Sequence, residues 1–128
     1  MNSHLFPTSQ QSVLNSLIEF NNAVPNNKLI LTTHSPYIIS YLTLAIKAHE
    51  LYGKAKNQQV KAKINEIVPE QSAVAAQDVV IYELNQTGEI KQLDVLNGLP
   101  SDDNYLNNEL EATNISFDKL LEIEDLCQ

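Results

Sequence analysis

Residues 28–37, with the sequence Lys-Leu-Ile-Leu-Thr-Thr-His-Ser-Pro-Tyr, constrain the fold of this chain more than any other stretch. The apolar run 29–31 shows no polar alternation, which is typical of a strand covered on both faces in the parallel sheet of an α/β protein. The pair Ser35-Pro36 precedes a periodic apolar segment, so Ser35 is expected to be the N-cap of a helix and Pro36 its first residue. We therefore predict a buried strand, a tight turn and a helix, with His34 at the carboxyl end of the strand.

The predicted strand would place His34 at the edge of the sheet at which ligands bind in open α/β proteins and toward which helix N-termini point. In one interpretation, the common one for an isolated histidine, the ring is hydrogen-bonded within the fold. In the other, the imidazole faces a phosphate or an attacking water. The hydroxyl groups of Thr32, Thr33 and Ser35 and the free N–H groups of the following helix would then lie beside it. The spacing of these residues leaves both interpretations open.

The charge composition narrows the classes of partner. The 128 residues carry a formal charge of −8, and all eight basic residues are lysines. Binding to phosphate backbones needs clustered basic charge, so nucleic acid is not expected as a main partner, and a chain without arginine supplies no arginine finger. The single cysteine, Cys127, cannot staple the fold, and no apolar run approaches the ~18 residues of a membrane span. We expect one cytoplasmic domain with no membrane partner.

Helical periodicity extends on both sides of the predicted strand. Residues 8–11 have the spacing of a capping box with Thr8 as N-cap, and the helix that follows should end near Ala23. The helix after the predicted turn should run to about Tyr52, with Gly53 as its C-cap. A helix that feeds a buried strand through a short turn is half of a βαβ unit, whose first strand is missing from this sequence.

The sequence of the second half of the chain predicts a helix, a β-hairpin and a C-terminal helix. A short amphipathic helix is expected over residues 58–67, and two strands over 78–84 and 89–95 should pair across a turn at 85–88. The acidic end of the chain is helical by its apolar spacing, with a break near Asn114. We divide the chain into a helix-strand-helix part (1–53), a lysine-rich insert (54–77), a β-hairpin (78–95) and an acidic helical segment (96–128).

Other candidate sites are weaker. A P-loop requires G-x-x-x-x-G-K-[ST], and the Gly-Lys pair at residues 53–54 is followed by alanine. Glu83 ends an apolar strand but runs into the hairpin turn, so we expect it to be a solvated strand residue. The other two histidines, His4 and His49, do not combine with His34 at zinc-ligand spacing, so no metal site is predicted. Cys127 is expected to be inert.

Two segments resemble a known family. Leu5-Phe6-Pro7-x-x-Gln10, a helix, and an apolar strand ending in Thr-Thr-His-Ser-Pro at residues 32–36 follow one another in this chain. This order is similar to the C-terminal part of ATP-binding-cassette-type ATPase domains, particularly predicted AAA-type ATPases related to the SMC, RecF and OLD proteins. The resemblance covers most of the chain, less clearly residues 53–77. It implies an α/β fold that is the C-terminal portion of a P-loop NTPase domain.

The resemblance also implies the roles of single residues. The Thr-Thr-His-Ser-Pro segment corresponds to the H-loop, in which His34 is the catalytic residue that contacts the γ-phosphate of ATP, with Thr33 and Ser35 beside it in nucleotide binding. The Walker A loop, the signature motif and the Walker B acids of the family have no counterpart in this sequence. Those parts hold the phosphates and Mg²⁺, so ATP and Mg²⁺ are implied only for the parent ATPase. We expect no tightly bound cofactor on this chain and no ATP hydrolysis by it alone.

Three hypotheses for function follow. The leading one is the C-terminal fragment of an ATPase, whose partner is the missing N-terminal portion or a second copy, because a lone strand leaves an edge that invites pairing. The alternative is a stand-alone, non-catalytic regulatory or interaction module with an ATPase-like fold. A third, an unrelated α/β enzyme with His34 as general base, is disfavoured because the sequence offers no partner acid or nucleophile.

Overall fold

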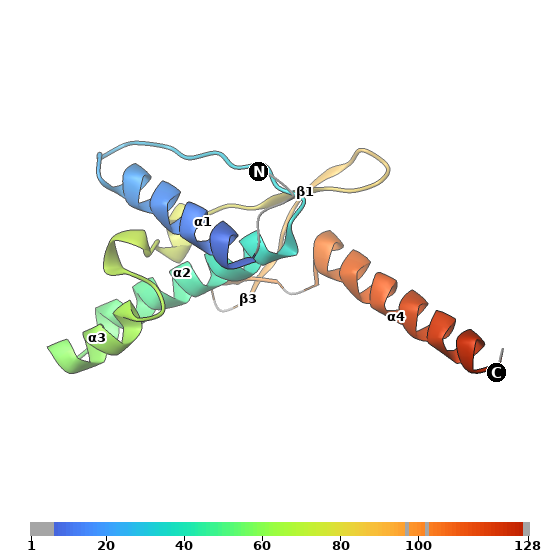
Figure 1. Cartoon of the computed structure of the whole chain (residues 1–128). Coiled ribbons are helices and arrows are strands. Elements are labelled where there is room, and N and C mark those ends of the chain that lie inside the picture. The colour runs from blue at the N-terminus through green and yellow to red at the C-terminus, as the bar shows by residue number, and fades with distance from the viewer. Residues whose placement is uncertain (1–6, 97, 102, 127–128) are drawn as a thin grey trace.

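The protein is a mixed α/β chain in which helices dominate (Figure 1). The computed structural model describes residues 7–96, 98–101 and 103–126. The elements, in chain order, are α1 (Pro7–Asn22), α2 (Pro36–Lys54), α3 (Gln58–Asn65), the 3₁₀ turns η1 (Glu70–Ser72) and η2 (Ala76–Asp78), β1 (Tyr82–Leu84), β2 (Ile90–Gln92), β3 (Val95–Leu96), β4 (Leu99–Pro100) and α4 (Tyr105–Leu126). The strands form two separate antiparallel pairs, β1 with β2 and β3 with β4.

Helix α2 is the centre of the body, because α1, α3, η1 and β4 all pack against it. Its apolar residues recur three and four positions apart, which puts them on one face of the helix. That face contributes to two small clusters of buried residues. The first contains Leu14, Ile18 and Ala45, and the second contains Ala48, Ile64, Val68 and Ala73.

Polar contacts fix the segment that carries η1 between α1 and α2. The Ser72 hydroxyl, with a side chain that is 1% exposed, donates to the Asn15 carbonyl oxygen at 2.9 Å. Asn22 Nδ2 donates to the Ala73 carbonyl oxygen, also at 2.9 Å. Burying a polar group without a hydrogen-bond partner destabilises the folded state. These bonds therefore specify where the segment lies.

The prediction of a buried strand at residues 28–33 is wrong. These residues have no assigned secondary structure and run as a drawn-out trace in Figure 1, they pair with no strand in the described chain, and Ile30 is 88% exposed. Leu29 and Leu31, at 38% and 40%, are less exposed than Ile30, so exposure alternates within the apolar run 29–31 as it does along a strand. The physical reason is that a central strand needs a hydrogen-bonded strand on each side. The four strands described here form inter-strand hydrogen bonds only within the pairs β1–β2 and β3–β4, so residues 28–33 have no neighbouring strand.

The predicted hairpin is confirmed, with shorter strands. β1 and β2 pair with Glu83 opposite Lys91, and the ladder continues through Leu93 N–H, which donates to the Ile81 carbonyl oxygen at 2.8 Å. Gly88 has a φ of +85°, a conformation that side chains disfavour, and it closes the turn. Of the expected first strand, Asp78 instead ends η2 and residues 79–81 belong to no strand, so the pairing is limited to three residues a strand.

Several helix boundaries differ from the expected ones. The first helix begins at Pro7 rather than after Thr8, whose side chain lies outside the described part, as do His4 and Cys127. Gly53 lies inside the last turn of α2, which ends at Lys54, and the C-cap that follows is the extended residue Ala55 and not a glycine. α3 ends two residues early, at Asn65, and α4 continues without a break through the Asn114 region.

Helix α4 leaves the body after its first turn (Figure 1). Asn104 begins it, because its Oδ1 accepts the Asn107 N–H at 2.9 Å in the manner of an N-cap. The carboxylate of Glu83 accepts the Tyr105 N–H, also at 2.9 Å. Glu83 is therefore a half-buried residue that caps a helix, contrary to the expectation of a solvated side chain. A carboxylate at a helix N-terminus also interacts favourably with the helix dipole.

Candidate functional site

The turn at residues 32–36 is held by its own hydroxyl groups. The Ser35 N–H donates to Thr33 Oγ1 at 2.9 Å, which closes the chain over His34. Ser35 has φ −96° and ψ 122°, the extended conformation of an N-cap, and Pro36 is the first residue of α2. The expected positions of cap and helix start are therefore confirmed, and Thr33, His34 and Ser35 are brought together in one turn.

Ser35 does not cap α2 with its side chain. Its hydroxyl donates instead to Gln10 Oε1 on α1, at 2.5 Å, and Gln10 is only 6% exposed. This hydrogen bond joins two segments that are 25 positions apart in sequence. It leaves the first turn of α2 without a side-chain acceptor for its N–H groups.

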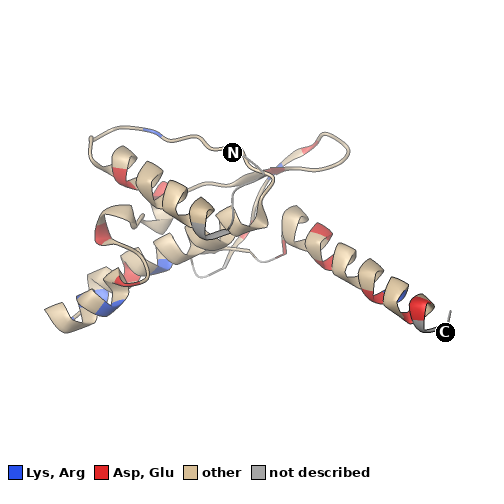
Figure 2. Cartoon of the chain, viewed as in Figure 1, with Lys and Arg blue, Asp and Glu red and all other residues tan. Residues whose placement is uncertain are grey.

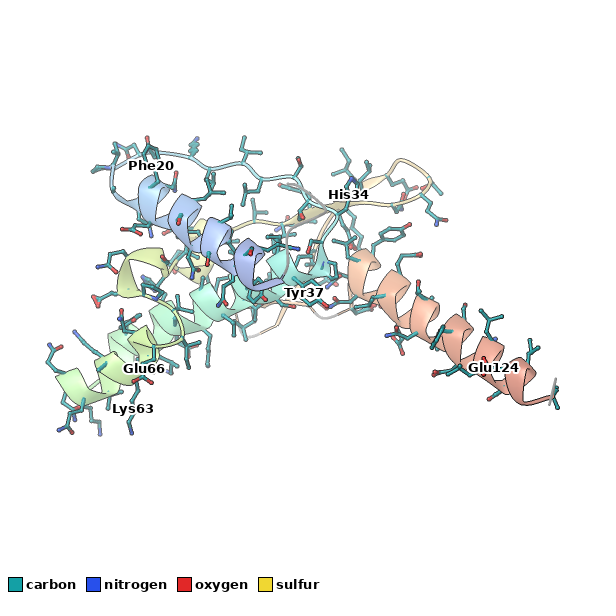
Figure 3. All side chains as sticks on the ribbon, viewed as in Figure 1. Phe20, His34, Tyr37, Lys63, Glu66 and Glu124 are labelled. Carbon is teal, nitrogen blue, oxygen red and sulfur yellow. The ribbon has the colours of Figure 1, made fainter. Side chains whose placement is uncertain are left out.

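His34 is exposed at the surface where the extended segment meets α2 (Figure 3). Its ring makes no hydrogen bond or ion pair with any described residue. The interpretation of a histidine hydrogen-bonded within the fold therefore does not hold for the described chain. Nearby, the ring of Tyr37, also exposed, stacks on Tyr41 with centroids 6.5 Å apart.

The other sequence candidates lie elsewhere. His49 and Glu50 line a shallow hollow of about 250 Å³ together with Ile46, Ala76, Gln77 and Gly98. The ammonium groups of Lys54 and Lys47, at 2.9 and 3.0 Å, lower the pKa of Glu50 by hydrogen bonding. Within the described ranges no group of three or more His, Cys, Asp or Glu side chains is placed to hold a metal ion. None of the helices described is long and apolar enough to cross a membrane.

The chemistry of the turn suits an anion. An imidazole, a threonine hydroxyl and the uncapped N–H groups of a helix start are all hydrogen-bond donors, and the helix dipole adds partial positive charge. Gln10 belongs to the segment that carries the resemblance, but it was not expected to be a site residue. Its role could not be read from spacing, because the bond to Ser35 depends on how α1 packs on α2.

Comparison of the chain with protein-family models, with curated proteins and with solved structures gives no match.

Proposed function

We propose that this chain forms the H-loop part of an ATP-binding domain, in which His34 contacts the γ-phosphate of ATP. The observation that carries the proposal is the hydrogen bond between Gln10 and Ser35. It ties together the two segments, Pro7–x–x–Gln10 and residues 32–36, on which the resemblance to ATPase domains rests. A buried amide that positions an otherwise exposed turn is the arrangement expected of a supported binding site.

The residues of the turn divide the work of binding a phosphate. The exposed ring of His34 forms no hydrogen bond with the described residues and can donate to a phosphate oxygen. Thr33 accepts the Ser35 N–H and keeps its own hydroxyl proton for a second bond. Hydrogen bonds to charged oxygens are about twice as strong as neutral ones. Bound ATP would supply the phosphoryl group, and the parts that hold its other phosphates and Mg²⁺ belong to another portion of the domain.

The extended residues 28–33 support the need for another portion. Ile30 exposes 88% of its surface, and the backbone of the segment is unpaired in the described chain. Burying an isoleucine side chain contributes roughly 1.5–3 kcal/mol, so an apolar strand left open is a strong site for pairing. We assign the missing neighbours to strands of the portion that carries the Walker A loop.

The test is to purify the tagged full chain from its source cells and to identify what accompanies it. We expect a polypeptide with a G-x-x-x-x-G-K-[ST] loop, and ATP hydrolysis by the complex but not by the chain alone. His34→Ala should lower kcat of the complex by about 10²-fold, the usual cost of removing one donor to developing charge. His49→Ala, which changes another exposed histidine, is the matched control and should leave kcat unchanged.

Two results would overturn the proposal. One is ATP hydrolysis at full rate by the purified chain alone. The other is a His34→Ala complex that hydrolyses ATP as fast as the wild type.

A non-catalytic interaction module is the second candidate, and the uncovered apolar side chains of α4 favour it. In that case the chain would still bind partners, but no nucleotide dependence would appear, and His34→Ala would affect neither binding nor hydrolysis.

A further inference from the structure

Helix α4 has the surface of a helix that packs on another protein surface. Every described side chain from Asn108 to its end is exposed, including large apolar ones. Leu110, Phe117 and Leu121 recur at intervals of seven and four, so they form one stripe along the 22-residue helix. The stripe extends beyond the body of the molecule, where no other described element covers it (Figure 1).

Charge is distributed unevenly between α4 and the opposite end of the molecule. α4 contains six acidic residues and one lysine, a formal charge of −5. Residues 47–67, which run from the end of α2 through α3 to just beyond it, contain five lysines and two glutamates, a formal charge of +3. The rest of the chain is acidic, so this lysine-rich end is the one basic region of the sequence.

The lysine-rich end is partly unpaired. Glu50 accepts from both Lys47 and Lys54, at 3.0 and 2.9 Å, and so neutralises only part of the local charge. The three lysines that follow form no ion pair with the described residues; they are Lys56, Lys61 and Lys63. Beside them Val60 and Ile67 are 41% and 63% exposed, so the surface offers apolar contact as well as positive charge.

The helix α4 of one chain does not lie near the lysine-rich end of the same chain. Figure 2 shows the two charges at opposite ends of the molecule, and Figure 3 places Lys63 and Glu124 at those ends. We propose that α4 docks on the lysine-rich end of a second copy of this chain, and that the second copy returns the same contact. Such a reciprocal pair has two-fold symmetry and makes both contacts with one rotation. A helix of this length is about 33 Å long, enough for several turns of contact on each side.

Charge-reversal variants of the full chain test the proposal by sedimentation velocity. The α4 variant carries E111K, D118K and E122K. The lysine-end variant carries K56E, K61E and K63E. The control variant carries D78K, E89K and D94K. It makes the same charge change as the α4 variant, but on exposed residues of η2 and the hairpin region.

We expect a dissociation constant for the dimer in the micromolar range. The wild type should then be mostly dimeric at about 50 µM. Either reversal at the proposed contact should raise the dissociation constant at least about tenfold, since like charges then face each other. Mixing the two contact variants restores opposite charges at both contacts and should restore a heterodimer. The control should dimerise like the wild type. Raising the salt from about 0.1 M to about 1 M shortens the Debye length from about 10 Å to about 3 Å and should weaken the dimer.

The inference does not depend on the ATP-binding proposal, which no outcome of this test changes. A wild-type monomer at that concentration would overturn it. So would a dimer that resists both reversals, which would instead indicate pairing through residues 28–33, or a mixture of the two variants that remains monomeric.

Discussion

At the scale of single residues, Gln10 decides how the turn around His34 is presented. A serine at the start of a helix normally accepts an N–H of the first turn. Here the hydroxyl of Ser35 donates to the buried amide oxygen of Gln10 instead. The helix start loses a side-chain cap, and the turn gains a fixed link to α1. The exchange makes sense if the free N–H groups of α2 have another acceptor to bind.

The two residues should therefore be energetically coupled. In a double-mutant cycle by urea unfolding, Gln10→Leu and Ser35→Ala should show an interaction free energy of about 1 kcal/mol, the net worth of one hydrogen bond. Thr113→Ala removes a comparable hydroxyl that bonds within α4 and serves as the control partner. Its effect should add to that of Gln10→Leu. Additive effects for Gln10 and Ser35 would mean that the bond contributes nothing to the fold.

At the scale of elements, sequence patterns predicted what local interactions decide. The helices α1, α2, α3 and α4 and the hairpin lie close to the expected places, because apolar spacing and turn residues act over a few positions. The prediction of a strand at residues 28–33 was wrong because strand formation depends on neighbouring strands that are distant in sequence. For the same reason the pairing of Gln10 with Ser35 and of Glu83 with Tyr105 was not foreseen. The three candidate residues of the turn are adjacent in sequence, so their placement together needed no long-range contact.

The contact between α2 and the segment that follows α3 is expected to depend on pH. The Tyr52 hydroxyl donates to the Val68 carbonyl oxygen at 2.7 Å, and burial, with a smaller contribution from Glu70, raises the pKa of Tyr52. The folded state thus keeps the proton at a pH where the unfolded chain loses it. The stabilisation is fully present below pH ~10, the ordinary pKa of tyrosine, and falls as the pH rises through the folded value.

Tyr52→Phe should lower the free energy of unfolding by about 1 kcal/mol at neutral pH, because it removes this hydrogen bond. It should also remove the part of the alkaline decline that comes from this hydroxyl, measured by urea unfolding between neutral pH and about pH 11. Tyr82→Phe, at an exposed position in β1, is the control and should change stability by less than about 0.5 kcal/mol. An alkaline decline equally steep in Tyr52→Phe and the wild type would contradict the assignment.

At the scale of the whole molecule, the body is small and leaves apolar side chains exposed on several elements. Two of these surfaces bear on the proposals above: α4, and the extended segment that leads to His34. The clusters around α2 contain only a few buried side chains, so the segment gains little from packing on this body. Exposure alternates along residues 29–31, with Ile30 outward, and a segment with this pattern can be covered by a partner that pairs with it.

Ile30→Lys tests partner binding through residues 28–33 separately from the stability of the isolated chain. Because Ile30 is 88% exposed, the substitution should change the free energy of unfolding of the chain by less than about 0.5 kcal/mol. In the complex proposed above the same side chain would be buried in a sheet, where an unpaired lysine costs several kcal/mol, so co-purification should be lost. Ile90→Lys makes the same change at a site that is 74% exposed on the hairpin and should keep the partner. Amide exchange gives an independent measurement: residues 29–33 should exchange rapidly in the chain alone and become protected in the wild-type complex only. If Ile30→Lys unfolds the isolated chain, or if the partner binds both variants equally well, residues 28–33 are not the strand that completes the sheet.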